Sequence, residues 1–320
     1  MKQVLCVQTD ADAARAVRVD TVEEPRCPDD GVIVAVKARP INPADLLLLQ
    51  GRHVYTPTLP SPVGIEGAGV VVEQGPQSTL APGTIVAIPF GGTWRERMAI
   101  RDADLLPLPS DVDMEQAAML CVNPFTVMGM LEGVSAGDTI ILNAATSAIS
   151  RQMLAVARRR GVLVIAVVRD ARAEASLKAE GAHAVIVDGD DLAARVAAVA
   201  PSRIVRGLDA VAGPASGRLY DCIGEGGDLL VYGLLASDRV ELPAARLVFR
   251  DVTVRGFSRL RAFAAMPTAR RQAITHELVA LLADGSLRAD IEARHPLEDV
   301  VAALTHHERP GRRGKILLVS

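Results

Sequence analysis

The feature that most constrains the fold is an alternation of short apolar runs and helical segments that begins near Met114. Thr139–Asn143 (TIILN) and Val162–Arg169 (VLVIAVVR) have the composition of buried strands, and a helix is predicted between them over Ser147–Arg160. Such alternation is typical of a parallel sheet covered by helices on both faces. The sequence therefore predicts an α/β fold with a doubly wound Rossmann domain over residues 116–284.

This domain is expected to hold further strands and helices. The predicted strands are Ala184–Asp188, Leu208–Val211, Asp228–Tyr232 and Val252–Gly256, and the predicted helices are Ala171–Gly181 and Thr268–Ala283.

The first 115 residues have a different character. Gly31–Lys37 and Gly67–Glu73 are apolar and β-branched, and prolines and glycines separate such runs. This pattern is typical of a small, partly open β-barrel. The apolar run Lys315–Val319 near the end of the chain is expected to return to it. We therefore predict a barrel domain over residues 1–115, completed by residues 285–320.

Composition narrows the class of partner. The chain of 320 residues has a formal net charge of -3, which gives no reason to expect a nucleic acid or an anionic membrane as partner. No apolar run is long enough to span a membrane, and the N-terminus lacks the pattern of a signal peptide, so a cytoplasmic location is expected. The four cysteines show no CxxC spacing and lie near no histidine, so neither a disulfide framework nor a clustered zinc site is predicted.

The turn after TIILN is a candidate phosphate-binding turn. Free N–H groups and the helix dipole favour an anion where such a turn meets a helix. The usual GxGxxG pattern is absent, and small residues (Ala144, Ala145, Ser147, Ala148 and Ser150) replace the glycines. A plain strand–helix turn would look the same, so both interpretations remain open from the turn alone.

Arginine after the second strand favours a dinucleotide, and NADPH in particular. An acidic residue at this place accepts the ribose hydroxyls in NAD sites, whereas arginine accommodates a 2′-phosphate. Arg169 stands there and Arg172 follows. The alternative is a surface arginine at a helix start, with Asp170 as the helix cap.

These motifs resemble the zinc-free medium-chain dehydrogenase/reductases, of the quinone reductase and 2-enoyl thioester reductase type. The similarity runs in order along nearly the whole chain. It comprises INPADLLLLQG (Ile41–Gly51), LPSPVGIEGAGVV (Leu59–Val71), GGTWRE (Gly91–Glu96), CVNPFTVMGML (Cys121–Leu131), NAATSA (Asn143–Ala148), VVRD (Val167–Asp170), YGLL (Tyr232–Leu235), FRDVTVRGF (Phe249–Phe257) and GKILL (Gly314–Leu318).

The resemblance implies a GroES-like β-barrel domain for catalysis beside the Rossmann domain, NADPH as cofactor, and a homodimer. Its implied cofactor-binding residues are Asn123 and Lys315, the turn residues Thr146, Ser147, Ala148 and Ile149, the 2′-phosphate ligand Arg169, and Tyr232, Gly233 and Phe257 on the nicotinamide side. No metal is implied, since Asp45 and Ile65 replace the cysteine and histidine ligands of zinc-dependent relatives.

The substrate half departs from the resembling reductases. Where they have a proposed tyrosine acid this chain has His53, with Tyr55 two residues on, and Ser258 replaces a tryptophan. The expected activity is NADPH-dependent reduction of an activated C=C bond, foremost a trans-2-enoyl thioester of CoA or an acyl carrier protein. His53 is the candidate general acid and Tyr55 the second choice. NADPH:quinone reduction is one alternative, and a catalytically decayed NADPH-binding or sensing protein is another.

Overall fold

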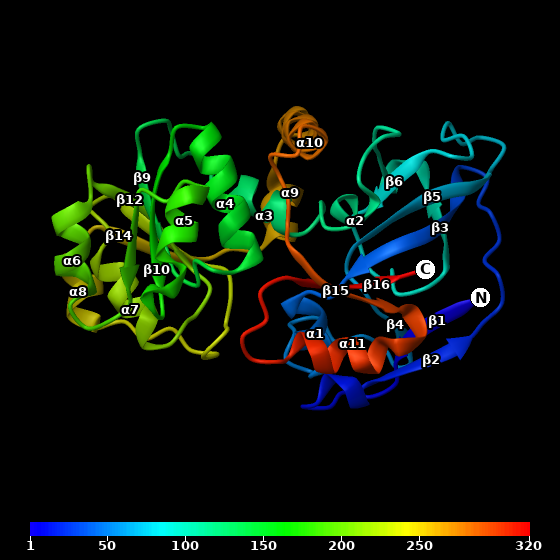
Figure 1. Cartoon of the computed structure of the whole chain (residues 1–320), viewed down its shortest axis with the longest axis horizontal. Helices are drawn as coiled ribbons and strands as arrows, with labels where there is room; N and C mark the ends of the chain where they lie inside the picture. Colours follow the sequence, from blue (N-terminus) through cyan, green and yellow to red (C-terminus); the bar gives the residue numbers. More distant parts are fainter. The chain divides into compact units, whose positions relative to one another are not determined.

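The computed structural model describes residues 1–320, which form two compact units (Figure 1). One unit comprises Met1–Asn123 and His276–Ser320, and the other comprises Pro124–Thr275. We call them the barrel unit and the Rossmann unit. The sequence placed the boundaries after residues 115 and 284, whereas the two units divide after Asn123 and after Thr275. None of the helices is long and apolar enough to cross a membrane.

A six-stranded, entirely parallel sheet forms the Rossmann unit, with strand order β11-β10-β9-β12-β13-β14. Its strands are β9 (Thr139–Leu142), β10 (Leu163–Val168), β11 (Ala184–Val187), β12 (Ile204–Asp209), β13 (Gly227–Val231) and β14 (Val252–Gly256). All four residues of β9 are buried, as expected for a strand covered on both faces. The predicted doubly wound fold is confirmed.

Helices connect these strands and cover the sheet. They are α3 (Asn123–Met130), α4 (Ala148–Arg159), α5 (Glu174–Glu180), α6 (Leu192–Val199), α7 (Pro214–Asp221), α8 (Ala244–Phe249) and α9 (Arg259–Ala265). Helix α10 (Thr268–Ala283) begins in this unit and ends in the barrel unit. Leu192 and Val196 of α6 and Leu219 of α7 share a core with Ile141 and Ile165 of the sheet.

One strand begins earlier than the sequence predicted. The apolar run placed it at Leu208–Val211, but β12 already begins at Ile204. The reason is Arg206, whose charge made this part of the chain look like a loop. In the fold its guanidinium pairs with Asp228 on β13 (Nε–Oδ1 2.6 Å) and donates to the carbonyl of Met130 (2.7 Å). The strand can therefore hold this charge without leaving it unpaired.

Two sheets build the barrel unit. The larger has the order β15-β16-β3-β5-β6-β8, with β7 also paired to β3, and the smaller has the order β2-β1-β4. The strands are β1 (Lys2–Cys6), β2 (Val17–Thr21), β3 (Gly31–Pro40), β4 (Ser61–Pro62), β5 (Gly67–Gln74), β6 (Ile85–Ile88), β7 (Arg97–Arg101), β8 (Leu106–Pro107), β15 (Ile291–Pro296) and β16 (Lys315–Val319). The helices are α1 (Pro43–Leu49), α2 (Met114–Ala117) and α11 (Val300–His307). Strand β16 pairs antiparallel with β3, which confirms the predicted return of the tail.

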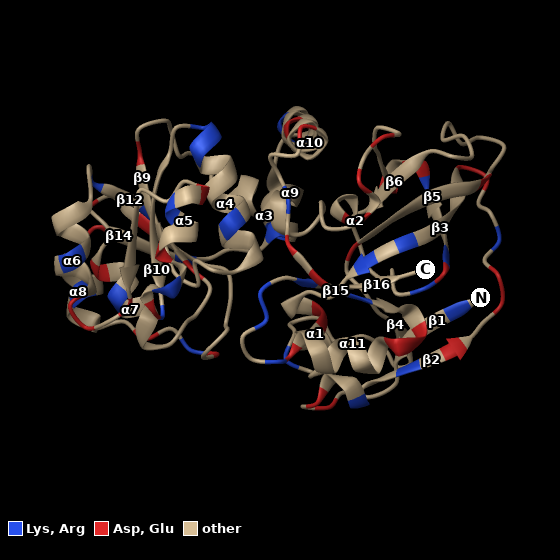
Figure 2. Ribbon diagram, viewed as in Figure 1, with Lys and Arg blue, Asp and Glu red and all other residues tan.

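The core of the barrel unit fixes the loop between β6 and β7. Trp94, the only tryptophan, is fully buried with Val4, Leu49 and Leu304. Arg39 on β3 is also fully buried, and its guanidinium donates to the carbonyls of Val36, Thr93, Arg95 and Leu318. Carbonyl partners replace the water that a buried cation loses. Elsewhere acidic and basic residues are interspersed over both units, in keeping with the small net charge (Figure 2).

Candidate functional site

The candidate phosphate turn joins β9 to α4 where the strand order of the sheet reverses. From β9 the chain continues to β10 and β11 on one side and then crosses to β12 on the other. Ligands of open α/β sheets bind beyond the carboxyl ends of the strands at such a point. Ala144 adopts a left-handed φ of 48°, a conformation that usually selects glycine. Ser147 caps α4, and its Oγ accepts from the N–H of Ser150 (3.3 Å).

This turn fits a phosphate group. The first turn of a helix leaves its N–H groups without intrahelical partners, and the dipole adds positive charge there. Thr146 is exposed, and Ser147, Ala148 and Ile149 are half-buried. The N–H of Ser147 donates to the carbonyl of Ala144 (2.9 Å), so the N–H groups of Ala148 and Ile149 are the candidates for a phosphate. The four predicted turn residues are thus brought together at the start of α4, and their contact with a cofactor stays a prediction.

A buried hydrogen-bonded pair, which the sequence did not predict, holds the ends of β9 and β12 together. Asn143 Nδ2 donates to Asp209 Oδ1 (2.7 Å), and Asn143 Oδ1 accepts from the N–H of Ala210 (2.8 Å). The same Asp209 oxygen accepts from the N–H groups of Val211 and Ala212 (2.9 and 3.0 Å). Because both side chains are buried and satisfied, they fix the edge of the sheet on which the turn stands.

Tyr232 and Gly233 follow β13 at the same edge. Desolvation raises the pKa of Tyr232 to about 12, against the opposite effect of a hydrogen bond with Ser150 of α4. The Tyr232 side chain is therefore a neutral donor or acceptor beside the turn. A Cβ atom at Gly233 would lie 2.6 Å from the carbonyl oxygen of Ala210, so the backbone approaches too closely for any side chain.

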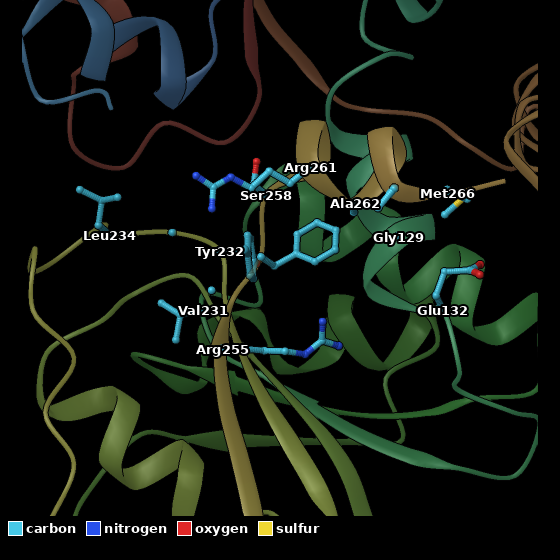
Figure 3. Close-up of a pocket in the computed structure, with 14 residues that line it drawn as sticks. Gly129, Glu132, Val231, Tyr232, Leu234, Arg255, Ser258, Arg261, Ala262 and Met266 are labelled. Atoms are coloured by element: carbon cyan, nitrogen blue, oxygen red, sulfur yellow. The ribbon is translucent and has the colours of Figure 1, made fainter. Parts of the chain in front are cut away.

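A pocket of about 820 Å³ opens beside these residues (Figure 3). Tyr232, Gly233 and Phe257 all line it, so three residues predicted for the nicotinamide side lie together. Phe257 is held by α3, since a Cβ atom at Gly129 would lie 2.8 Å from its ring. The sequence did not predict the cationic lining of this pocket by Arg255 and Arg261.

The two arginines predicted near the 2′-phosphate differ in availability. Arg172 pairs with both carboxylate oxygens of Asp170 (Nε–Oδ1 2.9 Å, Nη2–Oδ2 2.8 Å), and this contact lowers the pKa of Asp170 to about 2. Arg169 is exposed at the end of β10 and has neither a hydrogen bond nor an ion pair. Arg169 is thus free to bind a phosphate, whereas Arg172 is already neutralised.

In the barrel unit, Asp45, which stands where zinc-dependent relatives have a cysteine ligand, belongs to a buried polar cluster with Asn42, Glu66 and Lys315. Asn42 Nδ2 donates to Glu66 Oε1 (3.0 Å), and Asn42 N–H donates to Asp45 Oδ2 (2.8 Å). Lys315 Nζ donates to Asn42 Oδ1 (2.5 Å). Desolvation lowers the pKa of Lys315, partly opposed by Glu66 and Asp45.

This cluster does not fit a metal ion. Glu66 Oε2 accepts from the N–H groups of Cys121 and Val122 (2.9 and 2.8 Å), so its lone pairs already face donors. Burial, opposed in part by N–H donors and Lys315, raises the pKa of Asp45 to about 7. Zinc needs about three deprotonated ligands, and here an ammonium group stands beside the two carboxyls. The structure contains no group of three or more His, Cys, Asp or Glu side chains that could hold a metal.

Two predicted cofactor residues lie in or next to this cluster. Lys315 is buried and its ammonium group is held by Asn42, so the fold gives it an internal partner that the sequence did not indicate. Asn123 begins α3 directly after the two N–H groups that Glu66 binds, and it is half-buried. Contact of either residue with a cofactor stays a prediction.

The predicted acid candidates occupy the loop after α1. His53 Nδ1 accepts from the N–H of Tyr55 (3.1 Å), which assigns the proton of a neutral imidazole to Nε2. His53 is half-buried, whereas Tyr55 is 62% exposed. His53 is therefore the more buried of the two, and its catalytic role stays a prediction.

Two family models match parts of the chain. The model of the alcohol dehydrogenase GroES-like domain matches residues 28–110, and that of the zinc-binding dehydrogenases matches residues 180–318. The zinc in the latter description concerns that family at large, and Asp45 and Ile65 lie outside the matched range.

Curated and solved relatives are similar over the whole chain. The mitochondrial enoyl-[acyl-carrier-protein] reductase of Bos taurus is 31% identical, over 96% of this chain and 86% of its own. The quinone oxidoreductase of Pseudomonas syringae pv. tomato is 25% identical with a TM-score of 0.87, covering 100% of this chain and 99% of its own. The Escherichia coli quinone oxidoreductase, solved with NADPH, has the same fold (TM-score 0.87, 20% identity, 100% of both chains). This chain therefore belongs to the medium-chain dehydrogenase/reductase family of oxidoreductases, together with the enoyl-[acyl-carrier-protein] reductases.

Proposed function

We propose that this protein reduces the activated C=C bond of a trans-2-enoyl thioester with NADPH. The observation that carries the proposal is the pocket beside the α4 turn, lined by Tyr232, Gly233 and Phe257. It lies at the carboxyl edge of the sheet, where a dinucleotide-binding unit presents its reactive end. The bovine relative, whose name states this activity, matches the chain almost from end to end.

NADPH is the proposed cofactor because the residues present fit it. The N–H groups at the start of α4 would bind the pyrophosphate, and the unpaired Arg169 would bind the 2′-phosphate. Gly233 lines the pocket, and the close approach of its backbone to Ala210 admits no side chain there. When bound, NADPH supplies the hydride that reduces the β-carbon of the alkene.

The protein's own residues must stabilise the negative charge that develops on the substrate and supply a proton. Reduction at the β-carbon places negative charge on the thioester oxygen, which hydrogen-bond donors stabilise. The α-carbon then needs a proton from a general acid. We assign this role to His53, whose Nε2–H is set by the hydrogen bond at Nδ1, with Tyr55 as the second choice.

Quinone reduction is the second candidate function. A quinone takes its protons on oxygen from water, so it needs no acid in the position where the resembling reductases have tyrosine and this chain has His53. Two of the structural neighbours are named quinone oxidoreductases. The third interpretation, an NADPH-binding or sensing protein without turnover, rests on the two departures at His53 and Ser258.

Steady-state turnover separates the three. NADPH oxidation is followed by absorbance at about 340 nm, with crotonyl-CoA, crotonyl N-acetylcysteamine, cyclohexenone and 1,4-naphthoquinone at matched concentrations. The proposal expects the highest kcat/KM with the thioesters. Turnover of quinone alone would favour the second function, and tight NADPH binding without any turnover would favour the third.

A homodimer is the proposed assembly. Strand β14 is at the edge of the parallel sheet and offers unpaired backbone groups to a second copy. Next to it in the chain, α8 exposes Leu247, Val248 and Phe249 (45, 72 and 84%). Light scattering on the purified protein should give twice the chain mass of 33.8 kDa, and a monomer at micromolar concentration would contradict the proposal. The cytoplasmic location stays a prediction, since the bovine relative is mitochondrial.

A further inference from the structure

The pocket beside Tyr232 carries an excess of positive charge that hydride transfer to an alkene does not require. Three charged residues line it, namely Glu132, Arg255 and Arg261. Most of the remaining lining is apolar or glycine, including Val231, Leu234 and Met266. In a pocket of this kind a few charged or polar groups set which ligand fits.

Two of the three charges are already paired. Glu132 accepts from Arg270 (Nε–Oε2 3.2 Å). Arg255 donates to Asp228 (Nη2–Oδ2 3.0 Å), but Asp228 also pairs with Arg206. One carboxylate therefore serves two guanidinium groups, and a positive charge is left over at this end of the pocket.

Arg261 has neither a hydrogen bond nor an ion pair, although it is one of the lining residues. Figure 3 shows its side chain reaching from α9 toward the side of Leu234, while Glu132 lies on the opposite side near Met266. The acidic residue of the pocket is therefore not the partner of Arg261.

The pocket also offers a neutral hydrogen-bond donor. Ser258 lines the same pocket and occupies the N-cap position of α9, where a serine side chain usually accepts from the helix. It makes no such cap here, so its hydroxyl is available to a ligand. A planar guanidinium and a hydroxyl that line the same pocket match the oxygens of a carboxylate or a phosphate.

We infer that Arg261, assisted by Ser258, binds an anionic group of the substrate and selects for it. This inference rests on the proposed function, since it assigns the substrate specificity of the same pocket. Two parts of an enoyl thioester could carry this anionic group. It is either a phosphate of the carrier or a carboxylate on the acyl chain.

Three thioesters distinguish these sources when Arg261→Gln is compared with the wild type. Crotonyl N-acetylcysteamine is neutral, crotonyl-CoA adds the carrier phosphates, and the N-acetylcysteamine thioester of trans-2-heptenedioic acid adds only an acyl carboxylate. Arg259→Gln is the matched control, because Arg259 is on the same helix but does not line the pocket.

The inference predicts that Arg261→Gln raises KM about tenfold or more for one anionic thioester, with little change in kcat, as for a lost charge-assisted contact. The KM of Arg261→Gln for the neutral thioester, and the KM of Arg259→Gln for all three thioesters, should stay within about twofold of the wild-type values. Added salt should raise the KM for the anionic thioester only in proteins that retain Arg261. A loss confined to crotonyl-CoA identifies a carrier phosphate, and a loss confined to the dicarboxylic substrate identifies an acyl carboxylate.

Equal kinetics of wild type and Arg261→Gln on all three thioesters would overturn the inference, and so would an equal loss on all three. These outcomes differ from failure of the proposed function, in which the wild-type protein reduces none of the thioesters.

Discussion

Asp45→Asn should remove most of a pH-dependent destabilisation of the barrel unit. The Asp45 carboxyl is buried, and its pKa is raised from 3.8 to about 7, chiefly by desolvation. The folded protein therefore holds a proton on Asp45 that the unfolded chain loses between about pH 4 and pH 7. Because the folded state binds more protons in this window, the stability contributed by Asp45 is fully present below pH 4 and is lost as pH rises through 7.

The size of the effect follows from the shift. Each pKa unit corresponds to about 1.4 kcal/mol, so a rise from 3.8 to about 7 costs about 4 kcal/mol once the pH is above 7. Asparagine does not titrate and can still accept the N–H of Asn42 through its amide oxygen. The variant should lose about 1 kcal/mol at every pH because its helix cap is weaker. Its unfolding free energy relative to the wild type should then increase as the pH rises.

Urea unfolding from pH 4.5 to 8.5 measures this difference. Trp94 is the only tryptophan and is buried in the barrel unit, so its fluorescence reports the unfolding of that unit. Comparing two proteins that differ in one group cancels the titration of all other groups. A difference in unfolding free energy that stays constant across this pH range would show that folding does not raise the pKa of Asp45. A stability of the wild type that rises above the variant with pH would show that Asp45 is held ionised, as a metal ligand would be.

Three further predictions concern the cofactor, the metal and the acid. Arg169→Ala should weaken NADPH binding by roughly ten- to a hundredfold, because a charge-assisted contact contributes about 1.5–3 kcal/mol. NADH binding to this variant, and NADPH binding to the Arg172→Ala control, should change little. Calorimetric titration measures both affinities, and an equal loss for both cofactors would argue against Arg169. Elemental analysis of protein purified without added metal should show no stoichiometric zinc, and EDTA should leave turnover unchanged, whereas one bound zinc per chain would contradict the description of the polar cluster. His53→Ala should slow alkene reduction about 10²–10⁴-fold but quinone reduction much less, as measured by kcat on both acceptors. Near wild-type rates on both acceptors would show that His53 is not the acid, and Tyr55→Phe would be the next variant to test.

Much of the Rossmann unit could be predicted from the sequence because its signal is local. Buried strands such as β9 and β10 are apolar along their whole length, and that pattern is visible without knowledge of their neighbours. The start of β12 was missed because Arg206 is neutralised by Asp228 of another strand, which no local pattern shows. Helices α6 and α7 were not predicted, although Pro214 at the first turn of α7 is a recognised start signal.

In the candidate site, too, local features could be predicted from the sequence, whereas contacts between distant residues could not. The turn was predictable because small residues replace glycines there, and Ala144 has the left-handed φ that usually selects glycine, whereas Gly233 was implied only by the family resemblance. The pairing of Arg172 with Asp170 involves neighbours in sequence, and their spacing could have indicated it. The partners of Asn143 and Lys315 are distant in the chain, so only the fold reveals them.

Transfer of deuterium from the nicotinamide ring to the product shows directly whether this protein reduces an activated alkene. The protein is incubated with NADPH that carries deuterium on the transferred side of C4, together with crotonyl N-acetylcysteamine, and the saturated thioester is analysed by mass spectrometry and NMR. We expect one deuterium at the β-carbon and a solvent-derived proton at the α-carbon. NADPH oxidation without a deuterated product, or deuterium lost to solvent, would contradict the assignment of this chain as a reductase of activated alkenes.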